Sequence, residues 1–161
     1  MKTRYGTGWL IGLVLIGLVS TAFAEEDEDE EGRFTANNAR WKAECGSCHT
    51  AFPPQLLSAR DWGQIMSKLD KHYGSDASLE PAVTTEIRKF LEGNSGRRSG
   101  ASAKAGELPR ITQSSWFARE HREVPARLWK SKAVNTAANC AACHRGADKG
   151  DYSEDSVQLP K

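Results

Sequence analysis

The chain has 161 residues, in which 22 lysines and arginines nearly balance 21 aspartates and glutamates, so that the formal net charge is +1. This length predicts a single domain. The charge balance gives no support to nucleic-acid binding, because such a function requires basic residues clustered on one surface.

Residues 1–24 have the layout of a secretory signal peptide. Two basic residues precede an apolar run over residues 9–19, and Ala-Phe-Ala at positions 22–24 forms a small-residue cleavage site. We therefore expect cleavage before Glu25 and export to the periplasm. The alternative is an uncleaved membrane anchor, but the apolar run is shorter than the about 20 residues that a spanning helix needs.

An acidic block occupies positions 25–31, directly after the expected cleavage site. Like charges in such a block repel one another, which predicts a solvated and disordered leader over residues 25–33. A second interpretation is that the block docks the protein electrostatically on a basic redox partner.

Three helices are predicted in the first half of the chain. The first covers residues 35–49 and ends before the two prolines at positions 53–54. The second begins at a capping pattern and covers residues 58–74, with a glycine at its end. The third covers residues 81–93, with proline in its first turn and glycine as its last residue.

The second half is predicted to contain shorter helices. Residues 93–107 are rich in Gly, Ser and basic residues, which predicts a flexible connection between the two halves. A short helix is then expected from Ser114 to about Pro125, and another over residues 136–144. Beyond Arg145 the chain is polar, which predicts an irregular tail.

One pentapeptide pattern, C-x-x-C-H, occurs at residues 45–49 and again at residues 140–144, and it uses every cysteine of the chain. This pattern is the attachment signature for c-type haem: two thiols add to the haem vinyl groups, and the adjacent imidazole reaches the iron. C-x-x-C alone also suits a dithiol pair, a disulfide or half of a zinc site, but these alternatives leave the histidines unexplained. We predict haem attachment at Cys45, Cys48, Cys140 and Cys143, with His49 and His144 as iron ligands.

The second axial ligand of each iron is predicted by counting. Met66 is the only methionine left once the signal peptide has been removed, so one thioether cannot serve two irons. Two histidines remain, one in each half, and helical spacing places both among apolar residues. Sequence proximity pairs His49 with His72 and His121 with His144, and a crossed arrangement is the alternative. We therefore predict bis-histidine ligation of both irons.

These features together predict a mostly α fold, in which short helices pack around two covalently attached haems. The dihaem domain is expected over residues 34–152, with residues 153–161 as a C-terminal tail. No strand-like alternation of apolar and polar residues competes with this assignment. So short a chain has few apolar residues, and the haems are expected to supply much of its core.

Three passages of the sequence resemble a known family: residues 44–54, which contain the first motif, residues 56–74, and residues 116–147. In these passages the chain resembles the small periplasmic dihaem cytochromes c that are associated with an oxygen-binding monohaem c protein, the sphaeroides haem protein. The resemblance covers most of residues 40–152. It implies two bis-histidine haems, one-electron transfer, and redox partners that include the monohaem c protein and a membrane cytochrome b.

The leading functional hypothesis is a periplasmic electron carrier, because six-coordinate irons have no open position for a substrate. Bis-histidine ligation also predicts reduction potentials below those of a His/Met cytochrome. The alternative is a haem enzyme, a peroxidase or a small-ligand reductase, in which one iron is five-coordinate. A third hypothesis is a module without haem that is stabilised by disulfides or zinc.

Overall fold

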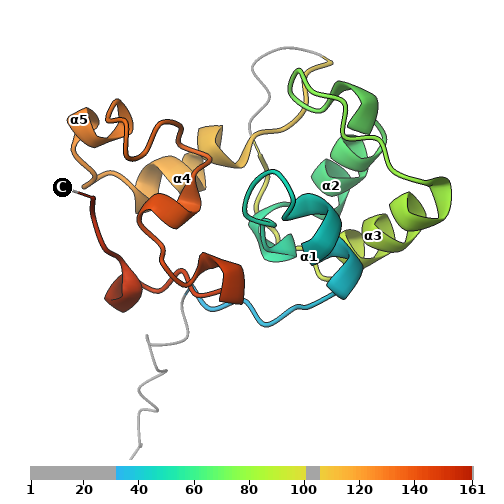
Figure 1. The fold of residues 1–161 in the computed structure, drawn as a ribbon, viewed down its shortest axis with the longest axis horizontal. Coiled ribbons are helices and arrows are strands. Elements are labelled where there is room, and N and C mark those ends of the chain that lie inside the picture. The colour runs from blue at the N-terminus through green and yellow to red at the C-terminus, as the bar shows by residue number, and fades with distance from the viewer. Residues whose placement is uncertain (1–31, 101–105, 161) are drawn as a thin grey trace, which may run out of the picture.

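The computed structural model describes residues 32–100 and 106–160, and the helices of these residues form two groups (Figure 1). The first half contains α1 (Ala39–Cys45), α2 (Ala59–Met66) and α3 (Pro81–Gly93), and the second half contains α4 (Ser115–Glu120) and α5 (Ala126–Trp129). Isolated bridges are the only β pairing among the described residues. The mostly α prediction is confirmed. Short 3-10 turns connect the helices at Pro54–Leu56, Leu69–Lys71, Ile111–Gln113, Cys140–Ala142, Ala147–Lys149 and Glu154–Ser156.

The predicted signal peptide and the acidic block at positions 25–31 lie outside the described residues. Within the described residues, no helix has both the length and the apolar content needed to cross a membrane.

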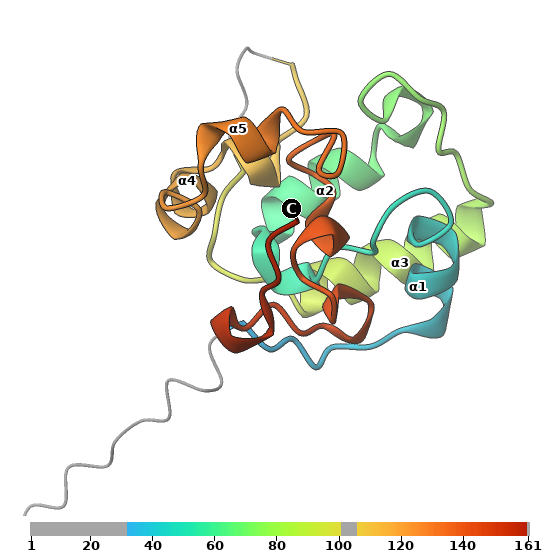
Figure 2. The same cartoon turned by 60° about the vertical axis from the view of Figure 1, so that its left-hand side comes forward.

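The main apolar core lies in the first half, where α2 and α1 both pack against α3 (Figures 1 and 2). Burying each large aliphatic or aromatic side chain in such a core contributes about 1.5–3 kcal/mol. The described residues of the second half bury fewer apolar side chains, chiefly Phe117, Leu128 and Val134. The apolar core of the second half is therefore the smaller of the two. The core of the first half consists of Trp41, Leu57, Trp62, Ile65, Met66, Ile87, Leu91 and Leu108.

Helix α1 is shorter than predicted at both ends. It begins at Ala39 because the Asn38 side chain caps it, with Asn38 Oδ1 accepting a hydrogen bond of 2.8 Å from the Trp41 N–H. It ends at Cys45, so that the rest of the first motif lies in a turn. His49 therefore stands outside the helix that was expected to carry it.

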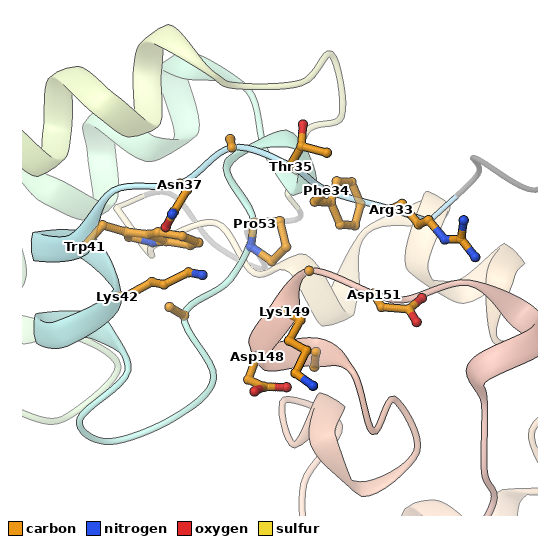
Figure 3. A pocket seen from close by; sticks show the side chains of 14 residues that line it. Arg33, Phe34, Thr35, Asn37, Trp41, Lys42, Pro53, Asp148, Lys149 and Asp151 are labelled. Carbon is orange, nitrogen blue, oxygen red and sulfur yellow. The ribbon is translucent and has the colours of Figure 1, made fainter.

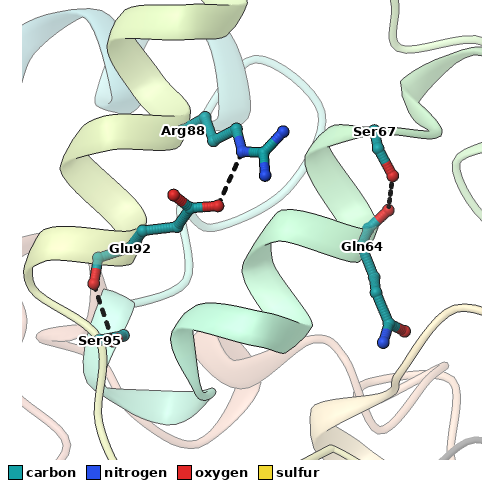
Figure 4. A network of polar contacts seen from close by, with 5 residues as sticks. All are labelled: Gln64, Ser67, Arg88, Glu92 and Ser95. Atoms are coloured by element: carbon teal, nitrogen blue, oxygen red, sulfur yellow. Dashed lines mark hydrogen bonds and ion pairs between the residues drawn. The ribbon is translucent and has the colours of Figure 1, made fainter.

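Helix α2 begins at its predicted cap, Ser58, but it ends at Met66 and does not continue to Gly74. Ser67 donates its hydroxyl to the Gln64 carbonyl at 2.8 Å, a local bond that competes with continued helix (Figure 4). Lys68 then leaves the helical region, with φ −137° and ψ 40°. His72 consequently lies in the turn that follows Leu69–Lys71, not on the predicted helix.

Helix α3 has the predicted bounds, and its exposed side carries an ion pair of 2.7 Å between Arg88 and Glu92, one turn apart (Figure 4). Exposed pairs of this kind contribute about 0.3–0.5 kcal/mol. Ser95 closes the end of the helix by donating its hydroxyl to the Glu92 carbonyl at 2.9 Å.

Residues 94–100 belong to the segment predicted as a connection, and hydrogen bonds tie them to the first half. The Gly96 N–H donates to the Leu57 carbonyl, and the Gly100 N–H donates to the buried carboxylate of Asp61, both at 3.0 Å. The Arg98 guanidinium lies 4.5 Å from the centre of the Trp116 ring at the start of α4. The described part of this segment thus contacts both halves.

The predicted helix over residues 136–144 is wrong. Only the 3-10 turn Cys140–Ala142 forms there. Asn135 takes a left-handed conformation with φ 63°, Thr136 Oγ1 accepts from the Ala138 N–H at 3.3 Å, and Asn139 Nδ2 donates to the Val134 carbonyl at 3.1 Å. These local bonds satisfy the backbone in a turn conformation and so replace the helical ladder.

The beginning and the end of the described chain pair with each other, and we call residues 32–34 and 150–152 the clasp. The Phe34 N–H donates to the Gly150 carbonyl at 2.9 Å, and the Tyr152 N–H donates to the Gly32 carbonyl at 2.8 Å. The chain before α1 runs beside the C-terminal segment in both views (Figures 1 and 2). The clasp thus joins the first half to the second.

Candidate haem sites

The first candidate site is formed by His49 and His72, whose rings lie close together and nearly parallel. The centres of the two rings are 6.2 Å apart, and their planes differ by 15°. His49 comes from the turn after α1, and His72 comes from the turn after Leu69–Lys71. The first half thus brings together the two histidines that sequence proximity had paired.

The second candidate site is formed by His121 and His144. Their ring centres are 6.1 Å apart, and their planes differ by 76°. His121 is the C-cap of α4, and His144 follows the turn Cys140–Ala142. The structure therefore contains two histidine pairs with nearly equal spacing, and the crossed pairing is not the one observed.

The spacing within each pair fits two imidazoles on opposite sides of one iron. An imidazole nitrogen binds a metal at about 2.0 Å and lies about 1.1 Å from its ring centre, so coaxial rings have centres roughly 6.2 Å apart. Rings in direct stacking contact would be closer than this. The residues present therefore fit a haem iron between each pair.

One histidine of each pair is anchored to the main chain through its Nδ1 atom. His49 Nδ1 lies 2.7 Å from the Thr50 carbonyl oxygen, and His121 Nδ1 lies 2.9 Å from the Phe117 carbonyl oxygen. A carbonyl can only accept, so the proton is on Nδ1 and Nε2 keeps its lone pair for a metal. The Nδ1 atoms of His72 and His144 are buried and have no hydrogen-bond partner among the described residues.

Burial lowers the pKa of His72 and of His144, and in each case the other imidazole of the pair lowers it further. Asp151 acts in the opposite direction on the pKa of His144. The neutral imidazole is the form that binds a metal. The surroundings of His72 and His144 thus favour the protonation state that metal ligation requires.

All four cysteines lie in the described residues, and none of them is in a disulfide. Burial raises the pKa of the Cys45 thiol and of the Cys140 thiol to about 11, and it also raises the pKa of Cys143. A reactive dithiol needs the opposite shift, because its thiolate must form near neutral pH. No group of three or more His, Cys, Asp or Glu side chains in the described residues could hold a metal ion. The thiols of Cys45, Cys140 and Cys143 are therefore unlike those of a reactive dithiol pair.

Aromatic rings flank all four imidazoles. Phe52 stacks on His49 with ring centres 4.7 Å apart, and Phe117 stacks on His121 at 4.0 Å. The edge of Tyr73 contacts His72 at 4.8 Å. Three further aromatic residues have other contacts: Trp41 packs on Phe90, Trp62 donates its indole N–H to the Pro54 carbonyl, and Trp116 lies under Arg98.

Tyr152 is a site residue that the sequence did not reveal. Its ring centre lies 5.1 Å from that of His144, and its hydroxyl is buried with no hydrogen-bond partner among the described residues. It belongs to a polar stretch that predicted an irregular tail. The only signal in the sequence was an aromatic residue in that otherwise polar segment.

A cavity of about 510 Å³ separates α1 from the turn Ala147–Lys149, next to the clasp (Figure 3). Its lining contains the basic residues Arg33, Lys42 and Lys149 and the acidic residues Asp148 and Asp151. No histidine or cysteine lines it. The cavity is therefore distinct from both histidine pairs.

Comparison with known proteins agrees with this arrangement. A sequence profile of the family described as dihaem cytochrome c matches residues 41–152, which include both C-x-x-C-H motifs and all four histidines. The chain belongs to the dihaem cytochrome c family. This dihaem cytochrome c accordingly carries two covalently bound haem c groups, for which its cysteines supply the attachment points, and it is a haem-based electron-transfer protein.

Solved structures of dihaem cytochromes c share its fold. The X-ray structure of the dihaem cytochrome c from Shewanella baltica OS155 is 37% identical with a TM-score of 0.68, and the match covers 76% of this chain and 93% of that one. A dihaem cytochrome c from Rhodobacter sphaeroides is 36% identical with a TM-score of 0.63, over 74% of this chain and 99% of that one. The comparison with curated proteins gives no match.

Proposed function

We propose that this dihaem cytochrome c shuttles single electrons between redox partners through two bis-histidine haems. One iron takes His49 and His72 as axial ligands, and the other takes His121 and His144. The observation that carries the proposal is the pair of neighbouring imidazoles in each half, with ring centres 6.2 Å and 6.1 Å apart.

The residues have distinct roles in this proposal. Each haem, when bound, supplies an iron that alternates between the ferric and the ferrous state and so carries one electron. The cysteines would tether the haem, and the two imidazoles would hold the iron from both sides, which would leave no open position for a substrate. Imidazole pairs also keep the reduction potential below that of a His/Met site. This arrangement supports a carrier and not a haem enzyme with an open iron.

Electron paramagnetic resonance of the oxidised protein tests the ligand assignment. We expect low-spin ferric signals from both haems and no binding of carbon monoxide by the freshly reduced protein. A substantial high-spin signal, or rapid carbon monoxide binding, would contradict six-coordination and favour a haem enzyme with one five-coordinate iron.

We further propose that the protein works in the periplasm after removal of residues 1–24. The support is the layout of the signal peptide and the c-type haem motifs, which are typical of exported cytochromes. Mass spectrometry of the mature protein should give a chain that begins at Glu25 and carries two haems. Recovery of the haem-loaded protein in the membrane fraction, with the signal still attached, would contradict this proposal.

The proposed partners are an oxygen-binding monohaem c protein and a membrane cytochrome b, which the family resemblance implies. Stopped-flow mixing of the reduced protein with an oxidised monohaem c protein should show electron transfer at a rate proportional to partner concentration. A rate no faster than that of an unrelated cytochrome c under the same conditions would contradict this partner.

A further inference from the structure

The two candidate sites are built on the same plan. In each, one imidazole is held twice, by stacking on a phenylalanine ring and by an Nδ1–H bond to a main-chain carbonyl. These are His49 with Phe52, and His121 with Phe117. The opposing imidazole has a tyrosine beside it and no partner for its Nδ1 atom among the described residues.

The sites differ in the angle between the ring planes. His49 and His72 are nearly parallel, at 15°, whereas His121 and His144 are nearly perpendicular, at 76°. The ring centres are almost equally far apart in both pairs, so the sites differ in the orientation of the rings and not in their spacing. This difference in orientation is not determined by the identity of the ligands, because all four are histidines.

We infer that the two haems of this protein are electronically inequivalent because their axial imidazole planes are near-parallel at the first iron and near-perpendicular at the second. Phe117 and Tyr152 are the positioning residues that hold the perpendicular pair. This inference rests on the proposed bis-histidine ligation and deepens it.

The orbital reason is general. Each imidazole has a π system perpendicular to its ring, which interacts with the iron d orbital that it overlaps. Parallel rings act on the same d orbital and separate it in energy from its neighbour. Perpendicular rings act on different d orbitals, which therefore stay close in energy. The size of this separation sets the anisotropy of the ferric low-spin signal, so parallel rings give a rhombic spectrum and perpendicular rings a larger maximal g value.

Contacts around the second pair explain why its rings keep different planes. The Phe117 ring is nearly parallel to His121, at 20°, and its carbonyl accepts from His121 Nδ1, so one residue fixes both the tilt and the rotation of the imidazole. The His144 ring lies at 42° to Tyr152, which the clasp holds through an edge contact of 5.5 Å with Phe34. The two imidazoles thus take their planes from separate parts of the fold.

The first test is the low-temperature spectrum of the oxidised wild-type protein. We expect two low-spin signals of equal intensity, one rhombic and one with a clearly larger maximal g value. Two low-spin signals of the same type would overturn the inference and leave the bis-histidine proposal intact. A high-spin signal from either haem would overturn both.

The second test assigns the positioning residues. Phe117→Leu removes the stacking ring but keeps the main-chain carbonyl, and we expect it to shift the large-g signal while the rhombic signal is unchanged. Phe117→Tyr keeps the aromatic ring at this position, so this variant should give the wild-type spectrum. Val134→Ala, which removes buried volume from the same half, serves as the matched control for destabilisation and should shift neither signal.

Tyr152→Leu probes the other imidazole of the pair and should also shift the large-g signal alone. If the Phe117→Leu protein does not retain both haems, Tyr152→Leu still provides an independent test. An unchanged large-g signal in both variants, or an equal shift in Val134→Ala, would overturn the positioning role.

Discussion

A histidine that binds a metal uses one of its two ring nitrogens. The hydrogen bonding of the other nitrogen, Nδ1, divides the four histidines of this chain into two kinds. His49 and His121 donate Nδ1–H to main-chain carbonyls, which fixes their tautomer and raises the basicity of the ligating nitrogen. His72 and His144 have buried Nδ1 atoms without a partner among the described residues. Each histidine pair thus combines one imidazole held by a hydrogen bond with one held mainly by packing.

Removing either His72 or His121 should leave one iron without its second axial ligand and should not affect the other iron. We expect His72→Ala to make the first haem high-spin and able to bind carbon monoxide when reduced, and His121→Ala to do the same at the second. Electron paramagnetic resonance and carbon monoxide titration should report one of the two haems in each case. Tyr73→Phe, which keeps the ring beside His72, is the control. An unchanged spectrum would remove that histidine from the ligand set.

Asp151 should make the stability of the clasp dependent on pH. Its carboxylate accepts from the Ser153 hydroxyl at 2.6 Å, the Ser153 N–H at 3.1 Å and the Ser156 hydroxyl at 3.2 Å. These hydrogen bonds, that of the Ser153 hydroxyl first, lower the pKa of Asp151. Because the folded pKa lies below the unfolded value of about 3.9, the stabilisation is present above that value and is lost as the pH falls through the folded pKa.

We therefore expect Asp151→Asn to lower the denaturation midpoint at neutral pH, with a difference from wild type that shrinks in acid. Guanidinium titrations at several pH values measure this difference. Asp155→Asn, at an exposed position of the same turn, should show no such trend. A difference between Asp151→Asn and wild type that is the same at neutral and acidic pH would contradict the role of the carboxylate.

At the scale of the elements, α4 is the short helix that carries His121, and its stability depends on its cap. Ser114 is buried, accepts from the Phe117 N–H at 3.1 Å and donates to the Ile111 carbonyl at 2.8 Å. We expect Ser114→Ala to cost about 1–2 kcal/mol in the free energy of unfolding, measured by denaturant titration. Ser115→Ala, at the exposed next position, should cost much less. Equal losses would show that the cap is unimportant.

How much of the elements could be predicted depended on where their signals lie. The bounds of helix α3 could be predicted from Pro81, the apolar face and Gly93, all of which can be read directly in the sequence. The end of α2 at Met66 and the turn after Asn135 depend on local hydrogen bonds of Ser67, Thr136 and Asn139, residues that are compatible with either a helix or a turn. Helix propensity alone could not decide whether these residues form a helix or a turn.

The candidate sites also have one part that the sequence could predict and another that it could not. Counting cysteines and histidines predicted the four candidate ligands, since few residues could fill the positions, and sequence proximity predicted the pairs that the structure brings together. The Nδ1 acceptors could not be predicted, because main-chain carbonyls carry no sequence signal. The ring planes depend on neighbours such as Tyr152, which lies far from His121 in the sequence and in a segment that predicted an irregular tail.

At the scale of the whole molecule, the clasp should be sensitive to Gly150. This residue has φ 82°, and a Cβ placed on it would lie 2.1 Å from the Phe34 carbonyl oxygen. The left-handed conformation alone costs about 1–2 kcal/mol for a residue with a Cβ, and the clash with main chain adds to it. We expect Gly150→Ala to lower Tm and to open the clasp to limited proteolysis.

Gly106→Ala provides the matched control for this experiment. Gly106 also has a positive φ, of 89°, but a Cβ there would meet no atom within 4 Å. It should therefore show the conformational cost without the clash. Equal losses of Tm in the two variants would mean that the close approach of Phe34 contributes nothing to the stability of the clasp.

The clasp also sets an order for folding. It joins the first and last parts of the described chain, so its formation closes a loop that contains both haem motifs, and long-range contacts of this kind form late because loop closure costs entropy. The Cys143 carbonyl accepts from the Gln158 N–H at 2.9 Å, so the second motif and the C-terminal segment must be arranged together. A chain that ends before Gly150 lacks both main-chain hydrogen bonds of the clasp, so its two halves are joined without this contact.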